Sequence, residues 1–257
     1  MKNINLNSDV GEGFGVYDIG NDTEMLEIVN SANIACGFHA GDPNVMDRVV
    51  KQSIKNGVSI GAHPGFNDLW GFGRRQIHMS ADEIEASVAY QIGALQAISA
   101  TNNAIVTHVK PHGALNNMSS LDPDIAAAIA KGVNLVDPKL ILVAVSGSFL
   151  FSAGQALGLT VAAEAYADRS YEDDGNMTSR KYDHAMIKDP EKAAAQVRNI
   201  VLNGYIIANS GKKVPVRADT ICIHGDEPTG PAVAQAVRKM LDREGIEVKP
   251  LPELHFG

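Results

Sequence analysis

Acidic, imidazole and basic side chains recur along this sequence, each time close to a glycine or a proline, as where Lys110 and His112 flank Pro111. Such groups suit general acid–base hydrolysis, in which Lys110 or His112 would stabilise an oxyanion. We therefore predict a hydrolytic site built from several separate segments. We assign catalytic roles to Asp9, His39, His63, Lys110, His112 and Asp226, and substrate- or phosphate-binding roles to Asn7, Glu12, Arg74, Arg75, Glu164, Asp168, Arg169 and His224.

A divalent metal ion is an alternative, because imidazoles plus a carboxylate form a typical hydrolytic metal set. The candidate ligands are Asp9, His39 and His63. The sequence has no HExxH motif and no paired CxxC motif, so the residues leave the question of a metal open. It also lacks a GxSxG motif, which argues against a serine nucleophile. We interpret the two cysteines, Cys36 and Cys222, as small core residues.

Two segments could bind an anion. Arg74 and Arg75 follow a flexible Gly71–Phe72–Gly73 run and could clamp a carboxylate or phosphate, although they could equally be a solvated pair. Residues 225–230 lead into a helix whose first amides could bind an anion, although an ordinary capped turn explains them as well. The Walker A motif is absent, since residues 209–213 lack its upstream glycine and its final serine or threonine.

Short β-rich runs alternate with helical stretches, which is the pattern of parallel βαβ units. We predict one irregular, TIM-like (β/α) barrel of seven to eight strands, spanning residues 1–257 as a single domain. The irregular segments are 11–21 and a polar loop over 169–188. The predicted strands are 4–9, 33–37, 58–62, 104–110, 140–145, 160–166 and 220–224, with 246–248 as a short last one, and the predicted helices are 23–29, 44–55, 80–100, 123–131, 148–157, 190–202 and 231–243.

The candidate site residues stand at the ends of the predicted strands. In a parallel α/β barrel these ends form one face, and active sites lie there. Side chains alternate across a strand, so Asn5, Asn7 and Asp9 share one side while Ile4 and Leu6 share the other. We therefore expect the polar side chains to point into the barrel mouth and the apolar ones to face the helices.

Composition restricts the partners. The formal net charge of −8 argues against a nucleic acid or an anionic membrane, because both require a basic surface. The first residues, from Met1 to Asn5, contain no apolar stretch of the kind found in signal peptides, and no run approaches the length of a membrane span. We expect a cytoplasmic protein.

Seven blocks, in order along the chain, closely resemble the LamB/YcsF family. Asn116, just after one block, stands where we expect an aromatic residue in many relatives, which leaves one substrate contact in question. The blocks are Asn7–Glu12, Ala35–Asp42, Gly61–Pro64, Phe72–Arg75, Val109–Leu115, Glu164–Arg169 and Cys222–Asp226.

The resemblance implies a barrel similar to those of the glycoside hydrolase/deacetylase superfamily. It also implies ATP-dependent opening of the lactam of 5-oxo-L-proline to L-glutamate, with ATP as co-substrate and 5-oxoprolinase subunits B and C (PxpB and PxpC) as partners. Our working hypothesis is that Asp9 or His63 activates water, while Lys110 and His112 hold the developing negative charge. Arg74, Arg75 or Arg169 would then bind the substrate carboxylate or the phosphate.

Two other functions fit the same residues. One is a metal-dependent deacetylase or amidohydrolase that acts on a sugar or a small amide and needs neither ATP nor partners. The other is a non-catalytic subunit that binds a lactam and delivers it to other proteins.

Overall fold

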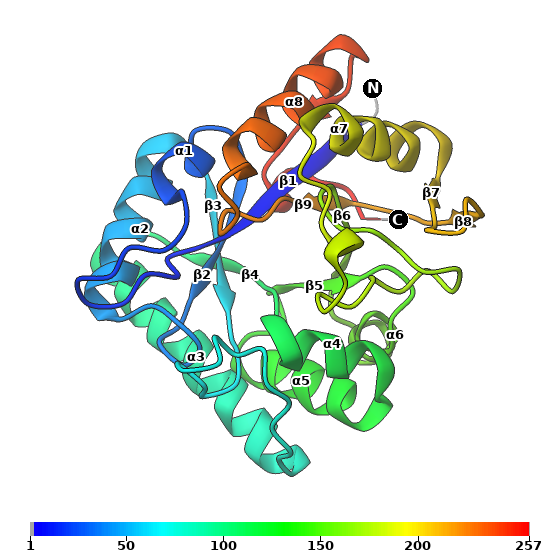
Figure 1. The fold of residues 1–257 in the computed structure, drawn as a ribbon. Helices are drawn as coiled ribbons and strands as arrows, with labels where there is room; N and C mark the ends of the chain where they lie inside the picture. Colours follow the sequence, from blue (N-terminus) through cyan, green and yellow to red (C-terminus); the bar gives the residue numbers. More distant parts are fainter. Residues whose placement is uncertain (1–2, 257) are drawn as a thin grey trace.

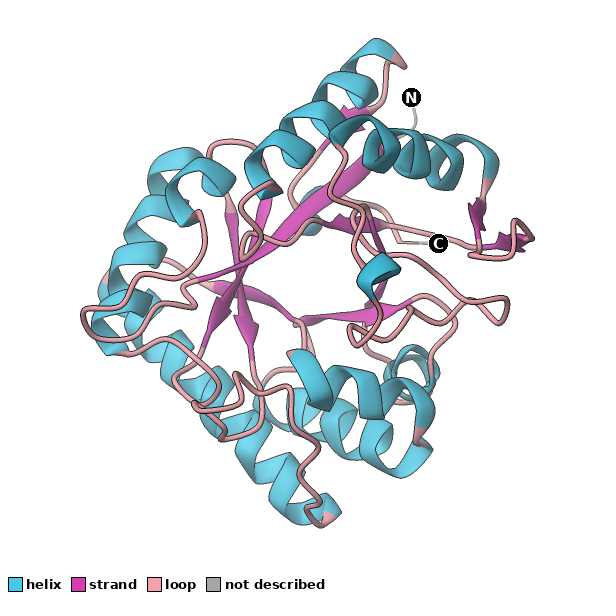
Figure 2. Ribbon diagram, viewed as in Figure 1, coloured by secondary structure: helices cyan, strands magenta, loops and turns pink. Residues whose placement is uncertain are grey.

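The computed structural model describes residues 3–256 as a ring of parallel strands surrounded by helices (Figure 1). Each strand pairs in parallel with its neighbours, and pairing of β9 with β1 closes the ring. Figure 2 shows the strands in magenta inside the outer layer of helices. The predicted (β/α) barrel is therefore confirmed. In order around the ring, the strands are β1 (Asn3–Val10), β2 (Ser31–Ala35), β3 (Ser59–His63), β4 (Val106–Val109), β5 (Ile141–Val145), β6 (Val161–Tyr166) and β9 (Thr220–Cys222).

The short strand predicted over 246–248 exists as β10 (Glu247–Val248), but it is not part of the ring. It pairs with the start of β1, where Asn3 lies opposite Glu247. The closed barrel therefore has seven strands, the lower of the two predicted numbers.

Apolar side chains fill the amino end of the barrel. Ile141 and Val143 of β5 form a buried cluster with Leu251 and Leu254 from the C-terminal segment, which includes the short helix η3 (Leu251–Glu253). Ser31, at the start of β2, is polar but paired there, since it accepts hydrogen bonds from Asn5 at 2.8 Å and from the backbone N–H of Leu251 at 3.2 Å.

The outer helices begin where the sequence places caps. Asp42 accepts hydrogen bonds from the backbone N–H groups of Asn44 and Val45, at 2.8 and 3.0 Å, and Ser80 forms the predicted capping box with Glu83. No helix within residues 3–256 combines the length and the apolar character that crossing a membrane requires. The predicted helices appear as α1 (Asp22–Leu26), α2 (Pro43–Asn56), α3 (Ala81–Thr101), α5 (Pro123–Val136), α6 (Phe149–Ala156), α7 (Pro190–Arg198) and α8 (Gly230–Arg243).

Three features were not predicted. Helix α4 (Gly113–Leu121) contains two asparagines and two serines, which are poor helix formers, and it forms because it packs against α5. A hairpin of β7 (Tyr205–Ile207) and β8 (Lys213–Pro215) stands outside the barrel before β9. The polar loop contains a short helix, η1 (Asp183–Ala185). The helix predicted over 190–202, by contrast, is present, because α7 continues as η2 (Asn199–Asn203).

The upper half of the barrel interior, toward the carboxyl ends of the strands, is a network of polar side chains, as the strand alternation predicts. The Asn7 amide donates to Thr220 at 2.7 Å and to Glu164 at 3.1 Å, and Asn33 donates to Asn7 at 2.8 Å. The contact between Asn7 and Glu164 joins β1 to β6, which are not neighbours in the ring, so these two side chains must point into the barrel. The network leaves few buried groups unpaired, which keeps its desolvation cost low.

Beside this network, the ring of His108 fills the space above Gly61, where a side chain would overlap it. Burial and the Lys110 charge lower the pKa of His108 to about 3, so the imidazole is neutral. Glycine is therefore required at position 61 by close packing.

Gly61→Ala should lower the free energy of unfolding by about 3 kcal/mol, because the new methyl group overlaps the His108 ring. Urea unfolding monitored by circular dichroism measures the change. Gly93→Ala is the matched control: nothing lies within 4 Å of its added carbon, in the middle of α3, so it should leave stability unchanged or raise it slightly. Equal stability of the two variants would contradict the packing of His108 on Gly61.

Candidate active site

Most of the predicted site residues converge at the carboxyl end of the barrel. They come from six of the seven strands or from the loops directly after them, and nearly all are buried. The residues brought together are Asn7, Asp9, Glu12, His39, His63, Lys110, His112, Glu164, Asp168, His224 and Asp226. They fall into three groups, which differ in charge and in what they can bind.

The first group is a cluster of three imidazoles and one carboxylate, Glu12, His39, His63 and His112. His112 Nδ1 lies 3.0 Å from His63 Nε2 and 3.3 Å from Glu12 Oε1, and His39 Nε2 lies 3.1 Å from the same Glu12 oxygen. The rings of His39 and His112 stack with their centroids 3.6 Å apart. Burial and the neighbouring imidazoles hold the pKa values of His39 and His112 well below the usual range, so both rings are neutral.

The loop after β3 holds this cluster in place. Gly73 lies directly against His39 and His112, and a Cβ atom there would come within 2.7 Å of His39 Cβ and 2.8 Å of the His112 ring. Phe72 adopts a φ of 53°, which is uncommon for a residue with a side chain, and thereby turns its carbonyl toward His112 Nε2 at 2.8 Å. Backbone strain of this kind is typical of functional sites.

Two backbone carbonyls fix the tautomers of the cluster. His63 Nδ1 donates to the Lys110 carbonyl at 2.6 Å, and His112 Nε2 donates to Phe72. When both rings are neutral, the inward nitrogens, His63 Nε2 and His112 Nδ1, each present a lone pair while only 3.0 Å apart. Two such lone pairs repel each other unless a cation or a proton lies between them.

The cluster fits a divalent metal ion. In a tetrahedral zinc site with Zn–N distances near 2.0–2.1 Å, neighbouring ligand atoms lie about 3.3 Å apart, close to the spacings found here. The four ligand atoms all lie within 4.8 Å of one another, and those of Asp9, Cys222 and His224 form a second such group. Of the predicted ligands, His39 and His63 are in the first group, and Asp9 Oδ2 lies beside it, 3.3 Å from His63 Nε2.

The second group surrounds Lys110, whose side chain is 2% exposed. Its Nζ lies 3.0 Å from Asp9 Oδ1 and 3.0 Å from Glu164 Oε1. Burial alone would lower the pKa of Lys110, but the carboxylates of Asp9 and Glu164 raise it well above its usual value. Burial would likewise raise the pKa of Asp9, and the His63 and Lys110 charges hold it well below its usual range. Both groups are therefore ionised at neutral pH.

The third group is a hydrogen-bonded pair, Asp168 and His224. His224 Nδ1 donates to the two Asp168 oxygens at 2.8 and 3.0 Å, and the His224 backbone N–H donates to Asp168 at 2.9 Å. This contact makes Nδ1 the donor to Asp168, and a ring nitrogen of His224 lies within 4.8 Å of the ligand atoms of Asp9 and Cys222. An imidazole oriented by a carboxylate is the arrangement of a general acid or base.

The three predicted arginines have different partners. Arg74, from the loop after β3, reaches across the mouth to Asp226, after β9, at 2.7 Å. Arg75 instead pairs with Asp68 in an outer turn. The guanidinium group of Arg169 is buried and donates to the backbone carbonyls of Thr178 and Ala185. The structure therefore brings Arg74 to the mouth but directs Arg75 and Arg169 elsewhere.

Sequence reasoning missed two residues that line the interior. Cys222, interpreted as a core residue, has its sulfur 3.0 Å from Lys110 Nζ. Tyr166 lies with its ring 5.3 Å from the same ammonium group, and its hydroxyl oxygen accepts from Asn116 at 3.3 Å. The alternation of β6 and β9 could have placed Tyr166 and Cys222 on the same side as Glu164 and His224.

Comparison with known proteins places this barrel in a family. The model of the LamB/YcsF family matches residues 4–256. The chain belongs to the LamB/YcsF family. A relative from Natranaerobius thermophilus, named as the A subunit of 5-oxoprolinase, is 50% identical over 98% of each chain. The crystal structure of the lactam utilization protein from Thermus thermophilus is 43% identical, with a TM-score of 0.92, and covers 98% of this chain and 100% of its own.

More distant solved structures share the fold with this LamB/YcsF protein. The T48 deacetylase, solved with its substrate, superposes with a TM-score of 0.51 at 14% identity, covering 98% of this chain and 89% of its own. This likeness confirms the predicted barrel type.

Proposed function

We propose that this chain opens the lactam ring of 5-oxo-L-proline to give L-glutamate, as the A subunit of an ATP-dependent 5-oxoprolinase. The names of its family relatives support this substrate class. The geometric observation that carries the proposal is the Asp168–His224 pair beside the ionised Asp9–Lys110 pair in one barrel mouth. The oriented imidazole can transfer a proton, and the two ionised groups can stabilise charge that develops while an amide is cleaved.

ATP serves to activate the lactam, because a five-membered amide has a poor leaving group. Transfer of the γ-phosphoryl group to the amide oxygen gives an imidate phosphate, and water then adds to the ring carbon. The C–N bond breaks as the ring nitrogen takes a proton, and a second water hydrolyses the resulting acyl phosphate to glutamate and phosphate. A mouth with buried charges can shelter these intermediates from bulk water.

The residues then take distinct parts in this reaction. Asp9, ionised and 11% exposed, can accept a proton directly from the attacking water. His224, oriented by Asp168, can deliver a proton to the ring nitrogen, which commits the intermediate to C–N cleavage rather than to loss of phosphate. Lys110 keeps a positive charge beside the reacting carbon.

His224→Gln should lower kcat for glutamate release by about 10²–10⁴-fold, the usual contribution of general acid–base catalysis. The assay contains the purified chain, subunits B and C, ATP and 5-oxo-L-proline. Asp168→Asn should cause a smaller loss, because it disturbs the orientation of the imidazole but keeps the ring.

His184→Gln is the control, since that histidine is exposed on η1 and should be dispensable. Unchanged kcat in His224→Gln would favour a non-catalytic, lactam-binding chain. Absence of turnover in the complete mixture, with release of acetate from acetylated sugars by the chain alone, would favour a metal-dependent deacetylase, the second function that the imidazole cluster fits.

We further propose that Glu12, His39, His63 and His112 bind one divalent metal ion. The ion would act as a Lewis acid on the substrate when bound. The supporting observation is that His63 Nε2 and His112 Nδ1 face each other 3.0 Å apart, close to the spacing of neighbouring ligands in a tetrahedral metal site.

Titration of the chain with Co²⁺, followed by calorimetry and by visible absorption, should show one site. His63→Ala and His112→Ala should each weaken binding by about 100-fold or more, since even residues that only support metal ligands contribute 10–100-fold. His255→Ala, far from the cluster in sequence and exposed, should bind as the unmodified chain does. Equal affinity in all of these variants would rule out the cluster as the metal site.

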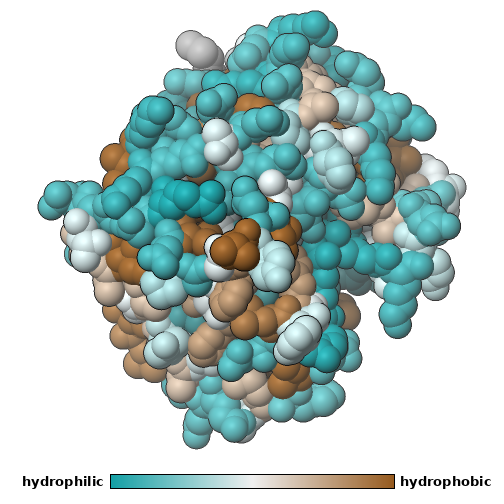
Figure 3. All heavy atoms as spheres, turned by 60° about the vertical axis from the view of Figure 1, so that its left-hand side comes forward, coloured by the Kyte–Doolittle hydropathy of each residue, from teal (hydrophilic) through white to brown (hydrophobic). Residues whose placement is uncertain are grey.

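The proposed partners, subunits B and C, need a docking surface. Exposed apolar side chains lie on two loops beside the barrel mouth, among them Val16 (94% exposed) and Trp70 (97% exposed). Both loops hydrogen-bond to the turn after β2, through Gly13 to Gly41 and through Asp68 to Phe38, so they are close together. Figure 3 shows apolar side chains gathered near the middle of this face. We define the apolar rim as Phe14, Val16, Tyr17, Ile19, Leu69 and Trp70.

We propose that the apolar rim docks a partner subunit through an apolar surface with basic residues at its edge. Exposed apolar patches of this kind commonly mark protein interfaces. The adjacent Asp18, Glu24 and Glu27 are exposed and acidic, which favours a basic edge on the partner. Docking here would place the partner over the mouth, where an activated lactam has the shortest path to the site.

The double variant Val16→Asp, Trp70→Asp should raise the partner concentration needed for half-maximal activity by about tenfold or more, because buried aromatic anchors dominate interface energies. Titration of the chain with subunits B and C in the glutamate assay measures this. The matched control, Ile105→Asp, Leu135→Asp, changes two exposed apolar residues away from the mouth and should titrate normally. The same shift in both variants would contradict docking at the apolar rim.

A further inference from the structure

Four acceptor atoms from three strands surround the ammonium group of Lys110 inside the barrel. They are two carboxylate oxygens, an amide oxygen and a sulfur, all of which are kinds of atom that bind metal ions in proteins. The ammonium group therefore lies at the centre of a set of cation-binding atoms. The distances from Lys110 Nζ are 3.0 Å to Asp9 Oδ1, 3.0 Å to Glu164 Oε1, 3.0 Å to Cys222 Sγ and 3.4 Å to Asn7 Oδ1.

Part of this set is suited to a transition metal ion. Ligand atoms of Asp9, Cys222 and His224 all lie within 4.8 Å of one another, and a carboxylate, a thiolate and an imidazole together form a typical zinc or cobalt ligand set. Lys110 donates to Asp9 and to the Cys222 sulfur. It therefore uses the acceptor atoms that a metal ion would need, and its charge repels a second cation.

Asp9 connects the position of the Lys110 ammonium group with the imidazole cluster. Its Oδ1 accepts from Lys110, and its Oδ2 lies 3.3 Å from His63 Nε2, one of the inward nitrogens of the cluster. A carboxylate that turns one oxygen toward each of two cations resembles the bridging ligand of a two-metal hydrolytic site, in which the ions lie about 3.5–4 Å apart. The mouth thus has the layout of a two-metal site, with an ammonium group in the second position.

A metal ion in that second position would interfere with proton transfer. It would bind the lone pairs of Asp9 and His224, the two groups that the proposed function uses to accept and to deliver protons. An ammonium group supplies a positive charge but accepts no lone pair from an imidazole. With Lys110 in this position, His224 stays available and keeps its orienting contact with Asp168.

We propose that Lys110 takes the place of a second metal ion and excludes such an ion from Asp9, Cys222 and His224. The mouth then holds one exchangeable cation, in the imidazole cluster, and one built-in cation, the ammonium group. The advantage for proton transfer rests on the proposed function, whereas the exclusion itself rests on the contacts of Lys110.

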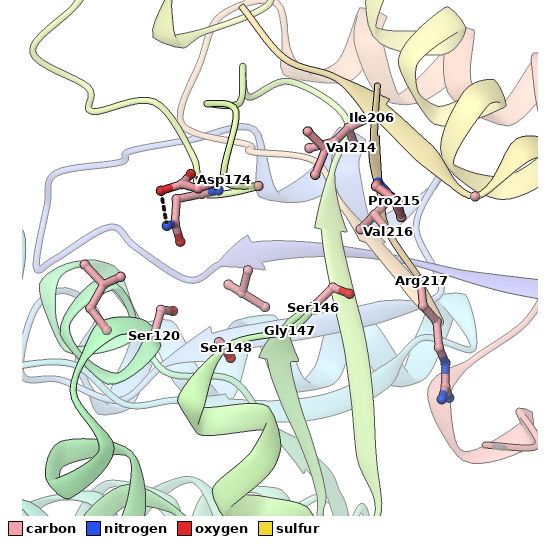
Figure 4. A pocket seen from close by; sticks show the side chains of 15 residues that line it. Ser120, Ser146, Gly147, Ser148, Asp174, Ile206, Val214, Pro215, Val216 and Arg217 are labelled. Atoms are coloured by element: carbon pink, nitrogen blue, oxygen red, sulfur yellow. Dashed lines mark hydrogen bonds between the residues drawn. The ribbon is translucent and has the colours of Figure 1, made fainter. Parts of the chain in front are cut away.

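The cavity between the β7–β8 hairpin and the end of β5 is a poor alternative place for a second ion (Figure 4). Its volume is about 570 Å³. Among the described residues that line it, Asp174 alone is of a type that commonly binds transition metals, and both of its oxygens accept hydrogen bonds from Asn176. An additional ion with a sulfur ligand can therefore be assigned to the position of the Lys110 ammonium group.

Co²⁺ titration of the isolated, metal-free chain tests the proposal, because a thiolate bound to Co²⁺ gives a strong near-ultraviolet charge-transfer absorption that imidazole and carboxylate ligands do not give. The unmodified chain should take up Co²⁺ without this absorption. Lys110→Ala should bind one more ion and show it, since loss of the ammonium group frees Asp9 and Cys222. A sulfur absorption in the unmodified chain, or its absence from the Co²⁺ complex of Lys110→Ala, would overturn the proposal.

The two cysteines provide a matched pair of controls. Lys110→Ala, Cys222→Ala should lose the sulfur absorption. Lys110→Ala, Cys36→Ala should keep it, because the Cys36 sulfur is buried in the core, 3.2 Å from the Ile34 carbonyl oxygen. The same spectrum in both double variants would contradict Cys222 as the ligand.

Thermal unfolding provides a second readout, since Lys110→Ala leaves buried carboxylates without their partner. At a hundredfold excess over its Kd, Co²⁺ should raise the unfolding midpoint of Lys110→Ala by about 5 °C or more, and by less in Lys110→Ala, Cys222→Ala. A Lys110→Ala chain that Co²⁺ neither folds nor stabilises would also count against the proposal. Both readouts use the isolated chain, so they hold whether or not the complete mixture releases glutamate.

Discussion

Lys110 carries an ammonium group into the barrel interior, where little water can solvate it. The group stays charged because Asp9 and Glu164 both lie 3.0 Å from it, and in turn it keeps Asp9 ionised. Removal of Lys110 would leave its buried carboxylate partners uncompensated, at a cost of about 3–5 kcal/mol. The polar upper half of the barrel is thus a single electrostatic unit. Asn7, which donates to Glu164, and Asn33, which donates to Asp9, extend it around the ring.

This unit also sets the character of the imidazole cluster beside it. The backbone carbonyl of Lys110 accepts a hydrogen bond from His63 Nδ1. The residue that keeps Asp9 ionised therefore also orients the His63 ring. The side of the mouth formed by β2, β3 and β4 therefore presents lone pairs, which suit a cation. The side formed by β6 and β9 presents an oriented imidazole, which suits proton transfer. The same barrel mouth can therefore bind a cation on one side and transfer a proton on the other side, a few ångströms away.

Much of this arrangement follows from local sequence rules. The two-residue alternation places Asn5, Asn7 and Asp9 inside the barrel, and the capping residues at Asp42 and Ser80 fix where two helices begin. Parallel strands then bring their carboxyl ends to one face. This reasoning predicts the barrel and most of the residues at its mouth.

What the sequence could not supply is the choice of partner for each charged side chain. The sequence suggests that Arg169 binds the substrate, but its partners are backbone carbonyls, which no residue pattern identifies. Arg75 pairs with Asp68 seven residues away, which a turn permits but does not require. The pairing of Asp168 with His224 depends on β6 lying next to β9, and the unpredicted β7–β8 hairpin separates those strands in the chain.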